Sequence, residues 1–113
     1  MTPIAPARGL EQRRAALAAA NEIRYRRAAL KVNLRRYSLP LSALTASDIV
    51  ARPPSWAQTM KARNLLVALP LIGDAKADRA LVACRINPRK TLGGLSDRQR
   101  ADLVEWLYQR AAA

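Results

Sequence analysis

The chain has 113 residues, and its 20 Lys and Arg outnumber its 8 Asp and Glu, which gives a formal net charge of +12 at pH 7. This charge favours a polyanionic partner, namely DNA, RNA or an anionic membrane. The length suits one domain with a modest core. Histidine is absent, which removes the commonest general base and metal ligand. The single Cys84 excludes an intrachain disulfide and a zinc cluster.

The first residues and the hydropathy of the chain predict where the protein works. Residues 1–9 contain Pro3 and Pro6 but no continuous apolar region, so we expect a disordered arm and no secretory signal. No apolar run approaches a transmembrane span. We therefore expect an intracellular, cytoplasmic protein that does not enter a membrane.

Residues 10–36 contain no Gly or Pro and are rich in Ala and Arg, which predicts a long helix. One apolar stripe is expected to pack on the rest of the fold, and it comprises Ala16, Ala19, Ile23, Leu30 and Leu34. A neighbouring stripe is basic and comprises Arg24, Arg27, Lys31 and Arg35. Only Glu11 and Glu22 are acidic here, so Glu–Lys pairing does not explain the basic stripe. A second nucleic-acid surface and a merely solvated helix face both remain open.

Two breaks separate the next elements. Pro40 suits the first turn of a short helix capped near Ser38 or Leu39. The apolar positions of that helix are Leu41, Leu44 and Ile49. After a second break at residues 52–55, Trp56 is expected to pack the loop onto the core, and stacking on a nucleic-acid base is the alternative.

Residues 60–69 predict another helix with its leucines, Leu65, Leu66 and Leu69, facing inward. Lys61 and Arg63 lie near its start, where the helix dipole disfavours cations. This placement indicates that an anionic group lies close to the start of the helix.

Residues 69–100 form the unit around which we expect the chain to be organised. Residues 69–73 predict a tight hairpin, and Asp74 then begins a helix with Lys76 and Arg79 on one side. Its other side carries the apolar residues Ala77, Ala80, Leu81 and Cys84. Turns are expected at Asn87-Pro88 and Gly93-Gly94. Ser96 and Gln99 form a capping box that starts a last helix over residues 97–110, which buries Leu103, Val104 and Leu107.

This order of elements suits the phosphate backbone of a nucleic acid. Free N–H groups at the hairpin and at the helix start face outward, and the helix dipole favours an anion there. Arg89 and Lys90 are expected to be exposed between the two turns. A generic loop between packed helices is the alternative. No segment alternates like a strand, so we predict an all-α fold of about five helices, with the long N-terminal helix packed on a compact domain.

Catalysis has little support in the sequence. No Ser–His or Cys–His pair exists, and Gly93-Gly94 lacks the following Lys-Ser/Thr of a phosphate-binding loop. The aspartates Asp74, Asp78 and Asp97 lie at helix starts, where capping and dipole effects account for them. We expect no enzyme, no metal and no cofactor.

Several short motifs from Met60 onward are similar to those of a known family. They are Met60-Lys61-Ala62, Leu65-Leu66, Ala68-Leu69-Pro70, Ile72-Gly73, Lys76-Ala77, Ile86 with Pro88, and Leu92-Gly93-Gly94-Leu95 with Asp97-Arg98-Gln99-Arg100. With the long basic helix before them, they make the sequence resemble the actinobacterial integration host factor family. That family is unrelated in fold to the dimeric β-arm protein of the same name.

The resemblance implies a monomeric, nucleoid-associated protein with a helix–two-turns–helix domain, here residues 37–110. Such a protein binds double-stranded DNA, bends, bridges or compacts it, and supports phage integration, which implies an integrase on the same DNA. Residues 70–73 and Lys76 match the family's phosphate-binding hairpin and helix start, and the loop after Pro88 matches its basic loop. Typical members carry arginines where this chain has Lys90, Thr91 and Gly93, and Arg89 would compensate. The expected DNA-contacting residues are Lys61, Pro70, Gly73, Lys76, Arg79, Arg89, Lys90, Thr91 and Gly94.

Two other classes share parts of this pattern. DNA glycosylases use the same two-turn unit, but they need an N-terminal Pro followed by Glu and usually a zinc finger. Here Thr2 follows Met1, Pro3 precedes Ile4, and zinc ligands are lacking. An RNA- or ribosome-associated binder is the stronger alternative, because backbone contacts do not separate DNA from RNA. Nothing places side chains on base edges, so we expect weak sequence selectivity.

Overall fold

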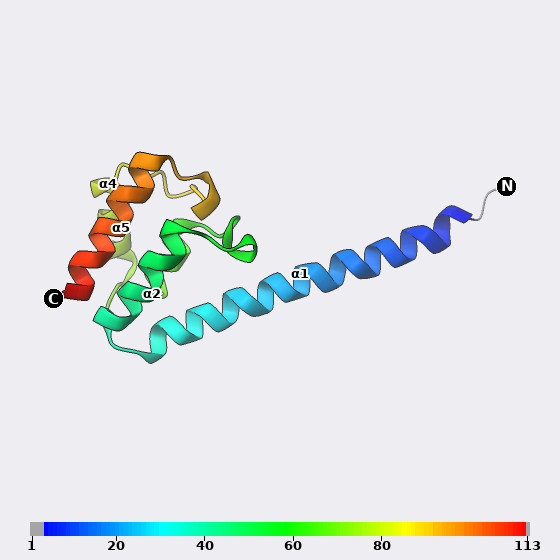
Figure 1. The fold of residues 1–113 in the computed structure, drawn as a ribbon, viewed down its shortest axis with the longest axis horizontal. Helices are drawn as coiled ribbons and strands as arrows, with labels where there is room; N and C mark the ends of the chain where they lie inside the picture. Colours follow the sequence, from blue (N-terminus) through cyan, green and yellow to red (C-terminus); the bar gives the residue numbers. More distant parts are fainter. Residues whose placement is uncertain (1–3, 113) are drawn as a thin grey trace.

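The computed structural model describes residues 4–112, with side chains from Gly9 onward, and this part of the chain is all-helical as predicted. It forms five α-helices and two short 3₁₀ helices. Their order is α1 (Ile4–Arg36), α2 (Leu39–Ala51), η1 (Ser55–Ala57), α3 (Ala62–Val67), α4 (Asp74–Ala83), η2 (Leu92–Gly94) and α5 (Asp97–Ala112). Figure 1 shows that α2 to α5 form a compact body from which α1 projects.

Helix α1 determines the elongated shape of the molecule, which measures 66 × 28 × 23 Å. Its 33 residues would span about 50 Å at 1.5 Å per residue, so the body is too narrow to cover it. Only its last turns are buried, through Leu30 and Leu34. The predicted apolar stripe is therefore wrong in its first part, because Ala16 and Ala19 are exposed and Ile23 is half-buried.

The start of α1 also differs from the prediction. The helix begins at Ile4 rather than at residue 10, so residues 4–9 of the expected arm are helical. Pro6 lies in the first turn, where a missing N–H costs nothing. Residues 1–3 of that arm lie outside the described part of the chain.

Helices α2 and α5 lie side by side and form the main helix pair of the body (Figure 1). Ser38 is the N-cap of α2 and Pro40 lies in its first turn, as predicted. The expected inward residues are wrong, because Leu41 and Leu44 are 57% and 43% exposed. The buried face consists of small residues, namely Ser42, Ala43, Ala46, Ser47 and Val50. Small side chains allow close helix packing, which leaves the leucines on the outer face.

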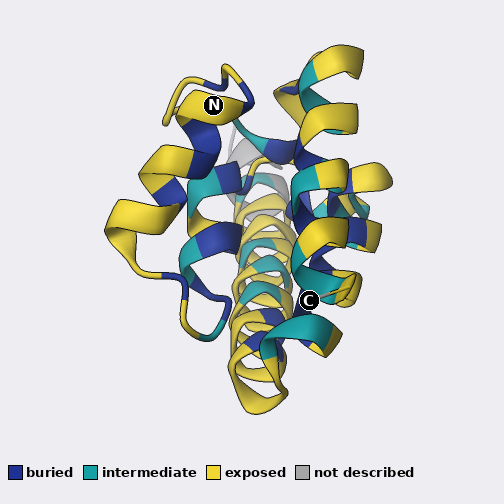
Figure 2. Cartoon of the chain, turned by 90° about the vertical axis from the view of Figure 1, so that its left-hand side faces the viewer, coloured by how far each residue is buried: buried dark blue, intermediate teal, exposed yellow. Residues whose placement is uncertain are grey.

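The core lies where the short helices meet. Its fully buried large side chains are Leu34, Leu65, Leu66, Leu81, Leu92, Leu103 and Leu107. Figure 2 shows buried residues on the inward faces of the body helices and exposed residues along most of α1. Trp56 is half-buried against this core, so its predicted packing role is confirmed. Val104 is only partly buried, and α3 ends at Val67, earlier than predicted, although Leu69 is still buried.

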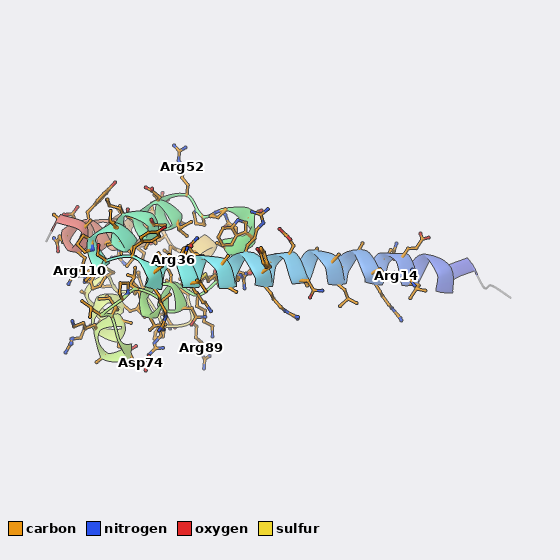
Figure 3. All side chains as sticks on the ribbon, turned by 90° about the horizontal axis from the view of Figure 1, so that it is seen from below. Arg14, Arg36, Arg52, Asp74, Arg89 and Arg110 are labelled. Atoms are coloured by element: carbon orange, nitrogen blue, oxygen red, sulfur yellow. The ribbon has the colours of Figure 1, made fainter. Side chains whose placement is uncertain are left out.

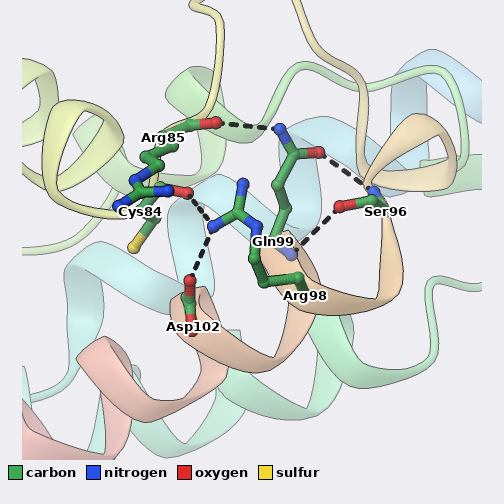
Figure 4. A network of polar contacts seen from close by, with 6 residues as sticks. All are labelled: Cys84, Arg85, Ser96, Arg98, Gln99 and Asp102. Atoms are coloured by element: carbon green, nitrogen blue, oxygen red, sulfur yellow. Dashed lines mark hydrogen bonds and ion pairs between the residues drawn. The ribbon is translucent and has the colours of Figure 1, made fainter.

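Side chains at the start of α5 form hydrogen bonds to the end of α4 (Figure 4). The predicted capping box is present: Gln99 N donates to Ser96 Oγ at 3.1 Å, and Ser96 N donates to Gln99 Oε1 at 3.0 Å. Gln99 Nε2 also donates to the Arg85 carbonyl at 2.9 Å, and Arg98 donates to the Cys84 carbonyl at 3.2 Å. These bonds satisfy carbonyls at the end of α4, which helices otherwise leave unpaired.

Cys84 is buried at the end of α4, as its place on the apolar face predicts. Burial raises the pKa of its thiol above the usual value, because a thiolate is poorly solvated there. The thiol is therefore a neutral core group rather than a reactive nucleophile.

Candidate nucleic-acid interface

The α3–α4 connection is the tight turn that the sequence predicts. Ile72 N donates to the Leu69 carbonyl at 3.3 Å, which closes a four-residue turn. Pro70 occupies its second position, and Leu71 has a φ of 65° at its third. This combination is typical of a type II turn. The turn brings Gly73 to the position just before α4.

The N-terminus of α4 is open to an anion. Gly73 is its N-cap residue and offers no side chain to the first N–H groups of the helix. The φ of Gly73 is −89°, and a Cβ at this position would meet nothing within 4 Å. Neither backbone geometry nor crowding within the protein therefore requires this glycine. A helix N-terminus without a side-chain cap favours negative charge, which Asp74 supplies in part from the first turn and which an external anion can add to.

The anionic partners of Arg63 lie within the protein itself. It donates to Asp78 at 2.9 Å and to Asp74 at 3.2 Å, across the α3–α4 connection. The hydrogen bond to Asp78 and the charge of this carboxylate raise the pKa of Arg63, and the same bond lowers the pKa of Asp78. The anionic group predicted near the start of α3 is thus this pair of aspartates, not an external ligand.

The loop after α4 pairs with the start of α3, a contact that local sequence patterns do not reveal. Ala62 N donates to the Lys90 carbonyl at 3.1 Å, Leu92 N donates to Met60 at 2.8 Å, and Gly93 N donates to Gln58 at 2.9 Å. Lys61 and Thr91 face each other as an antiparallel bridge. The pairing brings together four of the predicted contact residues, which are Lys61, Lys90, Thr91 and Gly94.

Both glycines of this loop lie close to other atoms of the protein. A Cβ on Gly93 would lie 3.0 Å from the carbonyl oxygen of Gln58. A Cβ on Gly94 would lie 3.0 Å from Thr91 Oγ1, which accepts a hydrogen bond from Gly94 N at 3.2 Å. Lys90 Nζ donates to the Gly94 carbonyl at 3.0 Å, so its ammonium group is held over the second turn.

Arg89 projects from the first turn of the loop. Lys90 N donates to the Asn87 carbonyl at 2.9 Å and Arg89 N donates to Asn87 Oδ1 at 2.8 Å, which confirms the predicted turn at Asn87-Pro88. The Arg89 side chain is exposed and points to the same side of the body as Asp74, opposite to Arg52 (Figure 3). The start of α4 and the basic loop therefore share one side of the molecule.

Lys76 and Arg79 lie on a different side of α4. They line a hollow with Leu39, Trp106 and Arg110, which belong to α2 and α5. Asp74 and Asp78 instead face Arg63 of α3. The predicted contact residues therefore form two groups that flank α4, with Pro70 and Gly73 between them.

The basic stripe of α1 is also divided. Arg24 is exposed on the projecting part of the helix. Arg27 is half-buried, and its guanidinium donates to the Trp56 carbonyl at 2.9 Å and to Thr59 Oγ1. Lys31 and Arg35 line a hollow against α3, and Arg35 also borders the turn at Pro70 and Gly73. These two cations therefore join the α3–α4 side rather than a separate surface.

The described residues contain neither a cluster suited to a metal ion nor a helix suited to a membrane. From residue 4 to residue 112, no group of three His, Cys, Asp or Glu is placed to hold a metal ion. No helix in this range has the length and apolar character needed to cross a membrane.

Comparison with known proteins gives two similar relatives. Over 95 residues the chain is 39% identical to a protein named integration host factor from Mycolicibacterium smegmatis (strain ATCC 700084 / mc(2)155). It is equally similar to the protein of that name from Mycobacterium tuberculosis (strain ATCC 25618 / H37Rv). Each match covers 84% of this chain and 88% of the relative. No protein-family model and no solved structure matches the chain.

Proposed function

The chain belongs to the actinobacterial integration host factor family, and from this premise we propose that it binds the phosphate backbone of duplex DNA with weak sequence selectivity. It acts as a nucleoid-associated architectural protein and not as an enzyme. It bends, bridges or compacts DNA in the cytoplasmic nucleoid, as a monomer in solution. By altering DNA shape it assists an integrase that acts on the same molecule.

The observation that carries this proposal is a set of unpaired cations around an open helix start. The ion pairs of the described residues involve only Arg26, Arg63 and Arg98 among the basic residues. Lys61, Lys76, Arg79 and Arg89 are exposed and form none of these ion pairs, and they lie on the two sides of the Gly73 turn. Cations and backbone N–H groups of this kind bind phosphates in any sequence, since they carry no base information.

Duplex DNA and duplex RNA compete for such a surface, and this competition tests the proposal. A labelled duplex DNA of about 20 base pairs, at a salt concentration near 0.1 M, is displaced by unlabelled duplexes of the same sequence as DNA or RNA. We expect the DNA competitor to displace the label at a lower concentration, because the A-form groove geometry of RNA changes the phosphate spacing. Equal displacement, or stronger displacement by RNA, would support the alternative of an RNA- or ribosome-associated protein.

Bridging requires a second surface, for which we propose the part of the basic stripe that does not join the α3–α4 side, represented by Arg24. Arg24 is exposed on α1, one turn before Arg27, and it borders neither the Gly73 turn nor α3 among the described hollows, so we expect it to reach a different stretch of DNA from the one at Gly73. Arg27 is left intact in the test because it packs against η1. We expect Arg24→Gln to reduce compaction of single DNA molecules under tension, while Arg52→Gln, which removes the same charge, leaves compaction unchanged. Full compaction by Arg24→Gln would show that this part of the stripe is only a solvated face.

A further inference from the structure

The hollow between α4, α5 and the start of α2 has a composition that the proposed backbone binding does not explain. It encloses about 470 Å³, within the usual range for small-molecule sites. Its floor is apolar and consists of Leu39, Ile72, Ala80, Ala83 and Trp106. The polar part of the lining is made of three cations, Lys76, Arg79 and Arg110, with no carboxylate among the lining residues.

The positive charge of the lining favours an anionic ligand in this hollow. Lys76 and Arg79 lie three residues apart on α4, so they are neighbours on the helix surface. Arg110 approaches them from α5. None of the three forms an ion pair within the described residues. Their mutual repulsion is offset when an anionic group binds between them.

Arg110 provides a planar surface in addition to its positive charge. Its Cζ atom lies 3.7 Å from the centroid of the Trp106 ring, so the guanidinium is stacked on the indole. Its Nη1 also donates to the Trp106 carbonyl at 3.2 Å, which fixes the orientation of the plane. Guanidinium planes and aromatic rings are the surfaces on which unpaired nucleic-acid bases stack.

From these features we propose that the hollow binds a mononucleotide. The base stacks on the Arg110–Trp106 pair, and the phosphate lies between Lys76 and Arg79. A fully paired duplex cannot occupy the hollow in this way, because its bases are already stacked on each other. An aliphatic carboxylate would satisfy the charge but leave the planar surface unused. The site overlaps the proposed backbone contacts at Lys76 and Arg79, and it differs from them in the stacking surface that Arg110 and Trp106 provide.

The fluorescence of Trp106 tests this binding directly, in the absence of DNA. The Trp56→Phe variant leaves Trp106 as the sole tryptophan, and it is titrated with adenosine 5′-monophosphate, ribose 5-phosphate or inorganic phosphate. We expect a saturable change with the nucleotide and roughly tenfold weaker binding of the two ligands without a base. Calorimetric titration of the unaltered chain provides the same comparison if Trp56→Phe lowers stability. Equal affinities for the three ligands, or no saturation with the nucleotide, would overturn the proposal.

Three variants separate the site from general electrostatics. Arg79→Gln removes a phosphate contact and Arg110→Gln removes the stacked plane, so each is expected to weaken nucleotide binding by tenfold or more. Arg52→Gln, whose side chain projects from another side of the body (Figure 3), removes the same charge and should change little. Arg79 is exposed on α4, so its variant stays informative if Arg110→Gln melts early. An equal loss of nucleotide affinity in Arg52→Gln would show that only the net charge matters, and it would contradict the proposed site.

Discussion

Arg24 and Arg27 occupy equivalent positions in the basic stripe of α1, but their surroundings in the folded protein differ. Arg24 is exposed, whereas Arg27 donates to the Trp56 carbonyl and to Thr59. These partners are 29 and 32 residues away in sequence. A helical pattern identifies which residues share a face, but it does not reveal which distant segment lies over that face. The stripe could therefore be predicted, and the structural role of one of its members could not.

We expect Arg27→Gln to lower the free energy of unfolding by about 1–3 kcal/mol, because it removes charge-assisted hydrogen bonds to a half-buried loop. The matched Arg24→Gln should stay within about 0.5 kcal/mol of the unaltered chain. Denaturant unfolding of the two variants gives the comparison. Equal stabilities would show that the Arg27 contacts contribute nothing to the fold.

Arg63 gives a prediction that depends on pH. The hydrogen bond from Arg63 lowers the pKa of Asp78 below its ordinary value of 3.8. The stabilisation from this pair is therefore present above the unfolded pKa of Asp78 and is lost as the pH falls through the lower folded value. Arg63→Gln should bring the pKa of Asp78 back toward its ordinary value, as followed by carboxyl NMR titration. A pKa that does not move would contradict the pairing.

At the scale of elements, the sequence correctly predicted those features that depend on residues close together in the chain. The capping box at Ser96, the Pro40 helix start and the apolar face of α4 all appear as expected. The choice of buried face on α2 failed, since Leu41 and Leu44 are exposed while small residues pack. The pairing of residues 58–62 with 90–93 is non-local and has no sequence signature. This pairing nevertheless positions half of the candidate interface.

The glycines Gly93 and Gly73 provide a matched pair for this interface. Gly93→Ala should destabilise the fold by about 1–3 kcal/mol, because its Cβ would approach the Gln58 carbonyl oxygen to 3.0 Å. Gly73→Ala meets nothing within 4 Å and should change stability by less than about 1 kcal/mol. It should instead weaken DNA binding, because the new methyl group covers the open start of α4. Unaltered affinity in a folded Gly73→Ala protein would remove this turn from the interface.

Leu103 tests whether α5 holds the two-turn unit in place. Its side chain is fully buried in the core. Leu103→Ala should cost about 2–5 kcal/mol, a large fraction of the stability of a small domain. Val82→Ala, at an exposed position of α4, is the control and should cost little. An unchanged melting temperature for Leu103→Ala would show that the packing of α5 on the core is not as described.

At the scale of the whole molecule, charge and shape act together. A net charge of +12 could be read from the composition, as could a polyanionic partner. The sequence did not reveal that α1 projects beyond the body (Figure 1). It also did not reveal that α4 separates the predicted contact residues into two groups. The projection depends on the length of α1 relative to the packed body. This geometry places cations of one chain on separate parts of the molecule, as the proposed bridging of DNA requires.

The salt dependence of DNA binding tests the central claim most directly. If about five phosphates are neutralised, the plot of log affinity against log salt concentration should have a slope of about −4 to −5 for duplexes of unrelated sequence. Lys76→Ala with Lys90→Ala should weaken binding to every duplex and reduce the steepness of the slope by roughly one for each lost contact. A slope near zero, or a strong preference for one short sequence, would contradict backbone-directed binding.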